Sequence, residues 1–185
     1  MEKDTNKQFD AAIKACRDIY MKKLTDYGPS WRILRASSLT DQIFIKANRI
    51  RNLQIKKVSK VGEGILPEFI AIVNYGIIGL IQLELGDTIL LDITSDKAAE
   101  LYDRHVETTR ELMTRKNADY DEAWRSMRVS SFADIILQKI MRTKQIEDNK
   151  GQTIISEGID ANYQDMINYA IFAIIKLSEN DGGEA

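Results

Sequence analysis

Four polar side chains near the C-terminus carry the chemistry that the sequence suggests most directly. Glu157, Asp160, Asp165 and Asn168 stand on what we predict to be the last helix of the chain. At about 100° per residue, Glu157, Asp165 and Asn168 lie within about 80° of one another, and Asp160 lies about 60° to the other side. Hard cations such as Mg²⁺ prefer a small group of such oxygens together with phosphate and water. We therefore predict that Glu157, Asp160 and Asp165 form a catalytic Mg²⁺ site, with Asn168 orienting a ligand or a metal-bound water.

The preceding predicted helix carries a basic face that could bind the same ligand. Asp134, Gln138, Lys139 and Arg142 share a sector about 140° wide, and apolar residues fill the opposite side. Two cations within one turn suit a phosphate or an acidic neighbour, and arginine offers a bidentate fork. We predict that Asp134, Lys139, Arg142 and, from an earlier helix, Lys116 contact the substrate. In the alternative interpretation, Lys139 and Arg142 neutralise the acids in a structural salt-bridge network.

Aromatic residues Tyr120 and Trp124 lie between these helices. Aromatic rings of this kind stack nucleobases. They also clamp helix–helix corners, with the indole N–H finding a partner. The sequence leaves both interpretations open, and the corner is favoured.

Other common catalytic arrangements are absent from the sequence. His105 is the only histidine and has no partners for a triad or a His/Cys zinc site, so we expect it to be solvated. Cys16 is the only cysteine; it lies on an apolar stripe, which predicts a small buried hydrophobe in a reducing compartment. No P-loop and no glycine-rich dinucleotide motif occurs.

The chain is a tandem repeat. Shifted by 93 positions, it shows 12 identities in the 27 positions from Lys23 to Arg49. The identical residues of the first copy are Lys23, Asp26, Tyr27, Trp31, Arg32, Arg35, Ser37, Ser38, Asp41, Ile43, Lys46 and Arg49. An offset of 94 then matches Glu63-Gly64-Ile65 and Asn74-Tyr75 to their counterparts in the second copy. The first copy has Leu66 and Ala71 in place of Asp160 and Asp165, which hints at one working site, in the second copy.

Periodicity predicts three helices in each copy. The first runs over about 6–25 and 95–118, opened in the second copy by the N-cap cluster Thr94-Ser95-Asp96. The second starts after the N-caps Ser38 and Ser131 and reaches about 56 and 148. The third ends near 85 and 177 and is apolar around most of its circumference, so it must be buried on more than one side. We therefore predict an all-α helical bundle with pseudo-two-fold symmetry, in which the two third helices pack together. Its parts are repeat 1 (1–86), a connector (87–94), repeat 2 (95–178) and a flexible tail (179–185), packed as one domain.

Charge and hydropathy exclude two classes of partner. Lysine and arginine (26) nearly balance aspartate and glutamate (28), whereas proteins that bind polymeric nucleic acid carry a basic surplus. The longest apolar stretch, 69–83, is interrupted by Asn74 and Gln82 and is too short for a membrane span. The N-terminus is charged and lacks the apolar region of a signal peptide. We expect a cytoplasmic protein that binds neither nucleic acid polymers nor membranes.

The combined pattern resembles the nucleotide modification associated domain 1 family, known from bacteria and phages. The residues that carry the resemblance are Lys116, Asp119, Tyr120, Asp134, Lys139, Arg142, Glu157, Asp160, Asp165, Asn168 and Tyr169. More distantly, Glu157, Asp160 and Asp165 look like the motif of the all-α nucleoside triphosphate pyrophosphatases of the MazG and dimeric dUTPase type. That resemblance implies paired modules, Mg²⁺ held on helix carboxylates and cleavage between the α and β phosphates. The second helix of those enzymes carries an acidic Glu-x-x-Glu, whereas this chain has Lys139 and Arg142.

Two hypotheses follow. The first is a nucleotide-binding or nucleotide-processing protein, in its most specific form a Mg²⁺-dependent (d)NTP pyrophosphohydrolase acting on a small-molecule nucleotide. The second is a non-catalytic helical scaffold or nucleotide sensor whose cations and acids pair structurally. Homo-oligomerisation is compatible with both.

Overall fold

All regular secondary structure in the described part of the chain is helical. The computed structural model describes residues 4–56 and 64–181, and the helix content confirms the predicted all-α class. Its elements are α1 (Thr5–Tyr27), η1 (Ser30–Ile33), α2 (Ala36–Lys56), α3 (Leu66–Leu85), α4 (Ser95–Tyr120), η2 (Ala123–Ser126), α5 (Val129–Asp148) and α6 (Ile159–Asp181).

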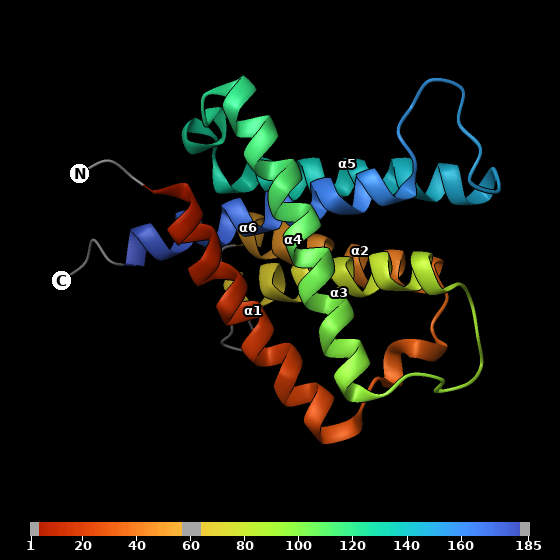
Figure 1. Cartoon of the computed structure of the whole chain (residues 1–185). Coiled ribbons are helices and arrows are strands. Elements are labelled where there is room, and N and C mark those ends of the chain that lie inside the picture. Colours follow the sequence, from red (N-terminus) through yellow and green to blue (C-terminus); the bar gives the residue numbers. More distant parts are fainter. Residues whose placement is uncertain (1–3, 57–63, 182–185) are drawn as a thin grey trace.

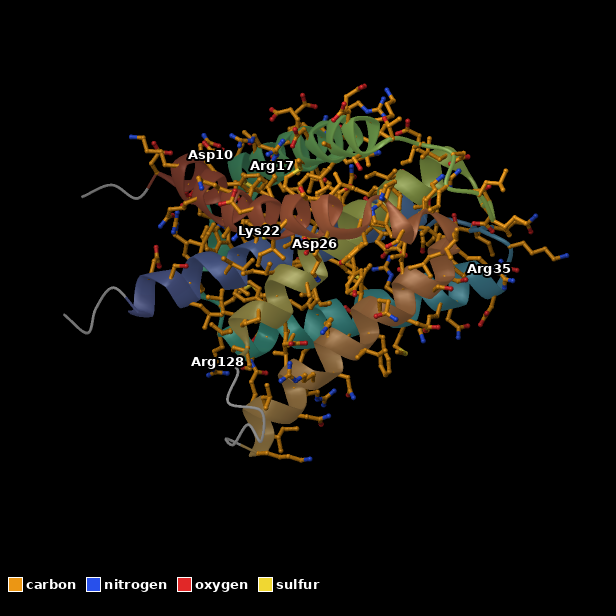
Figure 2. All side chains as sticks on the ribbon, turned by 90° about the horizontal axis from the view of Figure 1, so that it is seen from below. Asp10, Arg17, Lys22, Asp26, Arg35 and Arg128 are labelled. Atoms are coloured by element: carbon orange, nitrogen blue, oxygen red, sulfur yellow. The ribbon has the colours of Figure 1, made fainter. Side chains whose placement is uncertain are left out.

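The helices form three layers, with α3 and α6 in the middle (Figures 1 and 2). Helices α2 and α5 cover one side of this pair, and α1 and α4 cover the other. The contact between α3 and α6 is the most extensive in the protein, as predicted for the two third helices. Helix α3 is long and apolar enough to cross a membrane, but 61% of its apolar window is buried inside the protein. Its place in the core accounts for its composition.

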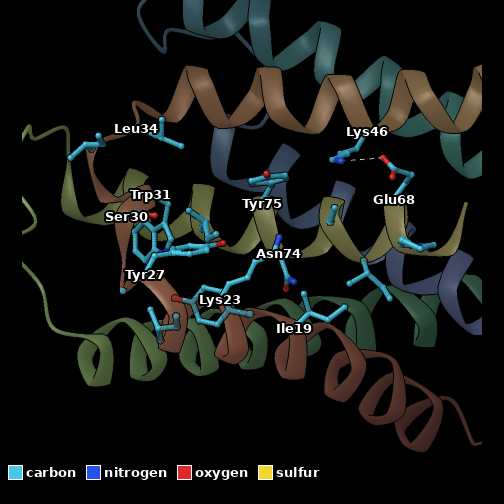
Figure 3. Close-up of a pocket in the computed structure, with 18 residues that line it drawn as sticks. Ile19, Lys23, Tyr27, Ser30, Trp31, Leu34, Lys46, Glu68, Asn74 and Tyr75 are labelled. Carbon is cyan, nitrogen blue, oxygen red and sulfur yellow. Dashed lines mark ion pairs between the residues drawn. The ribbon is translucent and has the colours of Figure 1, made fainter. Parts of the chain in front are cut away.

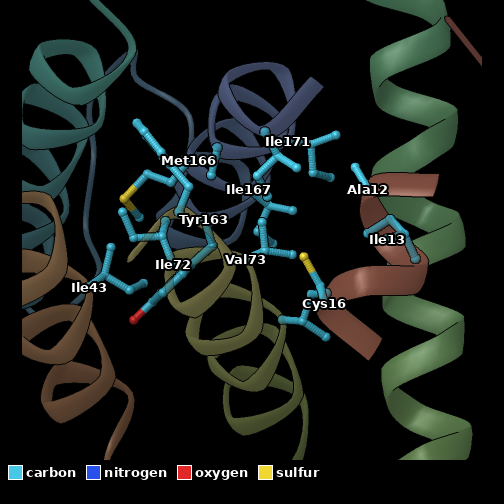
Figure 4. Close-up of a cluster of buried hydrophobic side chains, with 14 of the residues drawn as sticks. Ala12, Ile13, Cys16, Ile43, Ile72, Val73, Tyr163, Met166, Ile167 and Ile171 are labelled. Carbon is cyan, nitrogen blue, oxygen red and sulfur yellow. The ribbon is translucent and has the colours of Figure 1, made fainter. Parts of the chain in front are cut away.

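Two glycines let the central helices approach closely. A Cβ atom on Gly76 would lie 2.6 Å from Cγ1 of Ile167, and one on Gly79 would lie 2.6 Å from Cε1 of Tyr163. Around this contact the side chains of Ile72 and Val73 are fully buried together with those of α6 (Figure 4). The core therefore runs through the interface between the repeats.

Reciprocal ion pairs establish the pseudo-two-fold relation between the repeats. Each pair joins one repeat to the other, and its counterpart is found by adding 93 to one residue number and subtracting 93 from the other. The pairs are Arg17 with Asp103 (2.7 Å) and Arg110 with Asp10 between α1 and α4, and Lys144 with Asp41 (2.5 Å) and Arg51 with Asp134 (3.8 Å) between α2 and α5. Figure 2 shows Asp10 and Arg17 on the side of α1 that faces α4. This is the self-complementary pattern of a two-fold homodimer interface, built within one chain.

The predicted N-caps of the second helices are wrong by one turn. Helices α2 and α5 begin at Ala36 and Val129, so Ser38 and Ser131 lie inside the first turn. The carbonyl oxygen of Arg128 accepts a hydrogen bond from the backbone N–H of Ser131 at 3.0 Å, which makes Arg128 the N-cap. The short 3₁₀ helices η1 and η2 end directly before these positions, so each second helix starts earlier than the serines indicate.

The connector agrees with the expectation, whereas the tail differs from it in detail. Residues 87–94 form no regular element, and Thr94 caps α4 as predicted, accepting from the backbone N–H of Lys97 at 3.2 Å. Helix α6 continues to Asp181, and Glu179 accepts a hydrogen bond from Nε2 of Gln8 at 2.7 Å. The start of the predicted tail is therefore helical and bound to α1, and residues 182–185 lie outside the described range.

Candidate functional site

The structure brings most of the predicted site residues of the second repeat into one pocket. The pocket measures about 490 Å³ and lies between α4, η2, α5 and α6. The predicted residues that line it are Lys116, Tyr120, Trp124, Lys139, Glu157, Asp165 and Asn168. Residues more than 50 positions apart in the sequence thus converge because α4 and α5 both pack against α6.

Asp165 bridges the two lysines of this pocket. Its Oδ1 accepts from Nζ of Lys116 at 2.6 Å, and its Oδ2 accepts from Nζ of Lys139 at 2.6 Å. The Asp165 side chain is only 9% exposed, so this carboxylate needs its partners. Burial lowers the pKa of Lys116, but the hydrogen bond and the charge of Asp165 outweigh burial and raise that pKa. The arrangement matches the salt-bridge alternative for Lys139 and adds Lys116 to it.

The three predicted metal ligands do not meet. Glu157 is exposed and precedes α6, and Asp160 lines a different pocket together with Glu84 and His105. Both carboxylate oxygens of Asp165 are already bound by lysines. Within 4–56 and 64–181 no group of three or more His, Cys, Asp or Glu side chains is placed to hold a metal ion. This donor set does not fit Mg²⁺, because a divalent cation requires several oxygens that converge on one point.

Two of the predicted substrate contacts also lie elsewhere. Asp134 pairs with Arg51 across the α2–α5 interface. Arg142 lines a shallow hollow formed with the loop that follows α5. The helical wheel placed both residues on the face of Lys139. That face is wide enough for Lys139 to line the pocket, Asp134 to contact α2 and Arg142 to line the hollow.

The two aromatic residues, Tyr120 and Trp124, support different interpretations, base stacking and helix-corner packing respectively. Trp124 is buried and stacks on Phe172, with ring centroids 4.3 Å apart and planes 5° apart, and the Arg125 guanidinium lies 4.3 Å from the indole. Trp124 therefore packs the corner, although its indole N–H has no hydrogen-bond partner among the described residues. Tyr120 is 70% exposed beside the pocket and leaves its ring face open.

A second pocket, equivalent to the first, lies in the first repeat (Figure 3). It measures about 560 Å³ and is bounded by α1, η1, α2 and α3. Its lining includes counterparts of residues above, namely Lys23, Tyr27, Trp31, Lys46 and Asn74. It also includes Tyr75, whose counterpart Tyr169 lines the pocket of the second repeat. The sequence interpretation favoured a working site in the second repeat and left open whether the first repeat contributes residues to it. The recurrence of these residues was the signal that could have located this pocket.

The charges of the first-repeat pocket are arranged differently. Ala71 replaces Asp165, and the acid is instead Glu68, whose side chain is 4% exposed. Arg49 donates a hydrogen bond to Oε1 of Glu68, while Nζ of Lys46 lies 3.3 Å from Oε2 without a hydrogen bond. Lys23 has no ion-pair partner within the described ranges. Glu63, the counterpart of Glu157, lies outside those ranges.

The recurring asparagines tie the third helix of each repeat to the first helix. Nδ2 of Asn74 donates to the backbone carbonyl of Cys16 at 3.0 Å, and Nδ2 of Asn168 donates to the equivalent carbonyl of Thr109 at 3.3 Å. Asn168 thus has a positioning role in the helix packing and also borders the pocket.

His105 is not solvated, contrary to the sequence expectation. Its side chain is 16% exposed and its Nε2 lies 2.9 Å from Oε2 of Glu84. Burial lowers the pKa of His105 more than the hydrogen bond and charge of Glu84 raise it. Cys16 is fully buried, and burial raises the pKa of its thiol to about 12, as suits the small hydrophobe predicted from the sequence.

The model of one protein family, the nucleotide modification associated domain 1, matches residues 23–83 and again residues 116–177. The chain belongs to this family. The two matches start at Lys23 and Lys116 and include the pocket aromatics Trp31 and Trp124, so the family segment coincides with the part of each repeat that forms the pocket. No curated protein and no solved structure matches the chain.

Proposed function

We propose that this family member is a cytoplasmic nucleotide-binding protein that holds its ligand in a pocket between the helices of a repeat. The observation that carries the proposal is the recurrence of one pocket, with two lysines from different helices beside a tyrosine and a tryptophan. Lysine is a common phosphate ligand in proteins, and exposed aromatic faces stack bases at about 1–3 kcal/mol each. Both pockets fall within the roughly 300–1,000 Å³ range of small-molecule sites.

The charge balance supports a small nucleotide rather than a polymer. The formal net charge of −2 lacks the basic surplus that proteins binding a nucleic acid backbone usually carry. Cationic groups are instead collected inside pockets of limited size, where each phosphate contact acts at short range.

Mg²⁺-dependent pyrophosphohydrolysis is a second candidate, suggested by the distant resemblance to all-α pyrophosphatases. Only Glu157 and Asp165 of the predicted ligands share a pocket, and Asp165 is bound by Lys116 and Lys139. The geometry therefore favours binding over metal-assisted hydrolysis.

A thermal-shift screen tests the proposal. Nucleoside mono-, di- and triphosphates, each with and without Mg²⁺, are compared with unphosphorylated nucleosides. A ligand present at a hundred times its Kd stabilises the native state by about 2.7 kcal/mol. For a chain of this length that raises the melting temperature by roughly 5–11 °C.

Three outcomes separate the hypotheses. A shift that requires both base and phosphate supports nucleotide binding. Release of inorganic pyrophosphate that depends on Mg²⁺ and is lost in Asp165→Ala would instead favour the hydrolase. A chain that no nucleotide stabilises, and that cleaves none, is the scaffold of the second hypothesis.

A further inference from the structure

We infer that the two pockets have different ligands: the first repeat binds the phosphate group of the nucleotide between Lys23 and Lys46, whereas in the second repeat Asp165 occupies the corresponding anion position. The inference rests on the proposed function for the base, and on the pocket geometry alone for the phosphate. It moves the ligand site from the second repeat, where the sequence suggested it, to the first.

The second repeat shows that this pair of lysines is built around one two-oxygen anion. Lys116 reaches the site from α4 and Lys139 from α5, and each binds a different oxygen of the same carboxylate at 2.6 Å. A carboxylate and a phosphate both offer adjacent oxygens to cationic donors. Asp165 thus acts as a built-in anion between the lysines.

The first repeat keeps the lysines and lacks the carboxylate that the second repeat has at the position of Asp165. Lys23 and Lys46 occupy the equivalent positions on α1 and α2, and Figure 3 shows them coming from opposite sides of the pocket. At the position of Asp165 stands Ala71, whose methyl group supplies no charge. Among the described residues no carboxylate binds both lysines as Asp165 does, so an anion from outside can take that place.

The acid that is present, Glu68, is held on the other side by Arg49. Arg49 donates a hydrogen bond to Oε1 of Glu68. Lys46 lies farther from Glu68, with its Nζ 3.3 Å from Oε2, and makes no hydrogen bond to it. Lys46 can therefore turn toward a phosphate while Glu68 keeps an ion pair. The described lining of the pocket has two lysines, Lys23 and Lys46, and one acid, Glu68, so its cations outnumber its acids. A partly buried positive charge attracts an anion more strongly than a surface charge does.

The aromatic residues beside the lysines suit a phosphate that carries a base. Trp31 is buried in the wall, Tyr27 is 55% exposed, and Tyr75 projects from α3 between Trp31 and Lys46 in Figure 3. A ring face next to two cations fits a phosphorylated nucleoside, because the base stacks while the phosphate pairs. A cavity of about 560 Å³ accommodates a ligand of that size.

Exchanging the residue at the anion position between the repeats tests the inference. The variants are Ala71→Asp, which gives the first repeat its own anion, and Asp165→Ala, which removes the anion from the second. Binding is measured by isothermal titration calorimetry with inorganic pyrophosphate and with the nucleotide that gives the largest thermal shift. We expect one site per wild-type chain, at least tenfold weaker binding in Ala71→Asp, and a second anion site in Asp165→Ala.

Lysine variants provide the matched controls. Lys23→Met is expected to weaken pyrophosphate binding at least tenfold, while Lys116→Met leaves it within twofold of wild type. Circular dichroism melting identifies variants that fail to fold. If Asp165→Ala unfolds because its lysines lose their partner, Ala71→Asp and the two lysine variants still decide the question.

The two proposals fail in different ways. Unchanged affinity in Ala71→Asp, or a loss confined to Lys116→Met, overturns the assignment of the anion to the first repeat while nucleotide binding stands. Pyrophosphate binding that Ala71→Asp abolishes, without any nucleotide shift, retains the anion site and rejects the nucleotide. Failure of the wild-type chain to bind pyrophosphate or any nucleotide overturns the inference.

Discussion

Asn74 and Asn168 hold the same position in the two repeats, but only one of them has all its polar atoms bonded. The hydroxyl of Tyr102 donates to Oδ1 of Asn74 at 2.7 Å. Oδ1 of Asn168 is buried and has no hydrogen-bond partner in the part of the chain that the structure describes. The reason lies in the repeat: the counterpart of Tyr102 is Phe9, which has no hydroxyl. A buried acceptor without a donor costs about 1–3 kcal/mol.

Restoring the missing hydroxyl is expected to stabilise the protein. Phe9→Tyr places a donor where Tyr102 has one, and we expect a gain of about 1 kcal/mol, because the new hydrogen bond satisfies Asn168. The reciprocal variant Tyr102→Phe leaves Asn74 with the same defect and is expected to lose a similar amount. Urea unfolding followed by circular dichroism measures both. Destabilisation by Phe9→Tyr would show that the space around Oδ1 of Asn168 does not admit a hydroxyl.

Single residues of the candidate site were predictable where the repeat constrained them. Lys116 and Lys139 recur in the first repeat, whereas Ala71 stands there in place of Asp165. The structure brings the two lysines and Asp165 together. Asp160 was misplaced because a rotation of about 60° on a helix is enough to turn a side chain into another pocket. Sequence periodicity gives the direction of a side chain on its own helix and says nothing of which neighbouring helix it meets.

At the scale of the elements, helix ends were predicted best where a local signal sets them. Thr94 caps the start of α4 and Gly86, with φ of 76°, ends α3, in agreement with the helix ends predicted near 95 and 85. The N-caps predicted at Ser38 and Ser131 were wrong because serine also occurs inside the first turn of a helix. The 3₁₀ helices before them had no clear signature in the sequence. Residues far away in the sequence hold these 3₁₀ helices in place. Nε2 of Gln82 donates to the carbonyl of Arg32 at 3.0 Å, and Nζ of Lys176 donates to the carbonyl of Arg125 at 2.7 Å.

The close approach of α3 and α6 depends on glycine at position 76. Gly76→Ala would place a methyl group 2.6 Å from Cγ1 of Ile167. Although alanine favours helices, we expect a net loss of about 1–3 kcal/mol, because overpacking two central helices forces them apart.

The partner residue supplies the control for this prediction. Ile167→Ala alone leaves a cavity and is expected to cost about 2–5 kcal/mol. In the double variant the new methyl group fills part of that cavity, so the combined loss should be smaller than additive by at least about 0.5 kcal/mol in a double-mutant cycle. Strict additivity would show that the two positions are not in contact.

At the scale of the whole molecule, the repeat and the apolar third helix together were sufficient to predict the bundle. A helix as apolar as α3 needs burial on several sides, and a single repeat of fewer than 100 residues has too few partners to provide it. The replacement of Asp165 by Ala71 was visible in the sequence, but the resulting difference between the ion pairs of the two pockets was not. That difference arises from contacts such as Lys116 with Asp165, which join residues 49 positions apart on separate helices.

Dividing the chain in the connector tests whether it is a homodimer-like assembly within one polypeptide. Residues 1–90 and 91–185 are produced separately and together, with the cut in an exposed segment where Ile89 is 89% exposed. Alone, each half uncovers the α3–α6 interface, including fully buried Ile72 and Ile167, so we expect aggregation or self-association. Together they should form a one-to-one complex, because the ion pairs Arg17 with Asp103 and Lys144 with Asp41 join the halves in one register.

Light scattering after size exclusion gives the stoichiometry, and circular dichroism compares the helix content with that of the intact chain. Two halves that each melt cooperatively as folded monomers would mean that the repeats are independent domains, and that the pockets form without the interface between them.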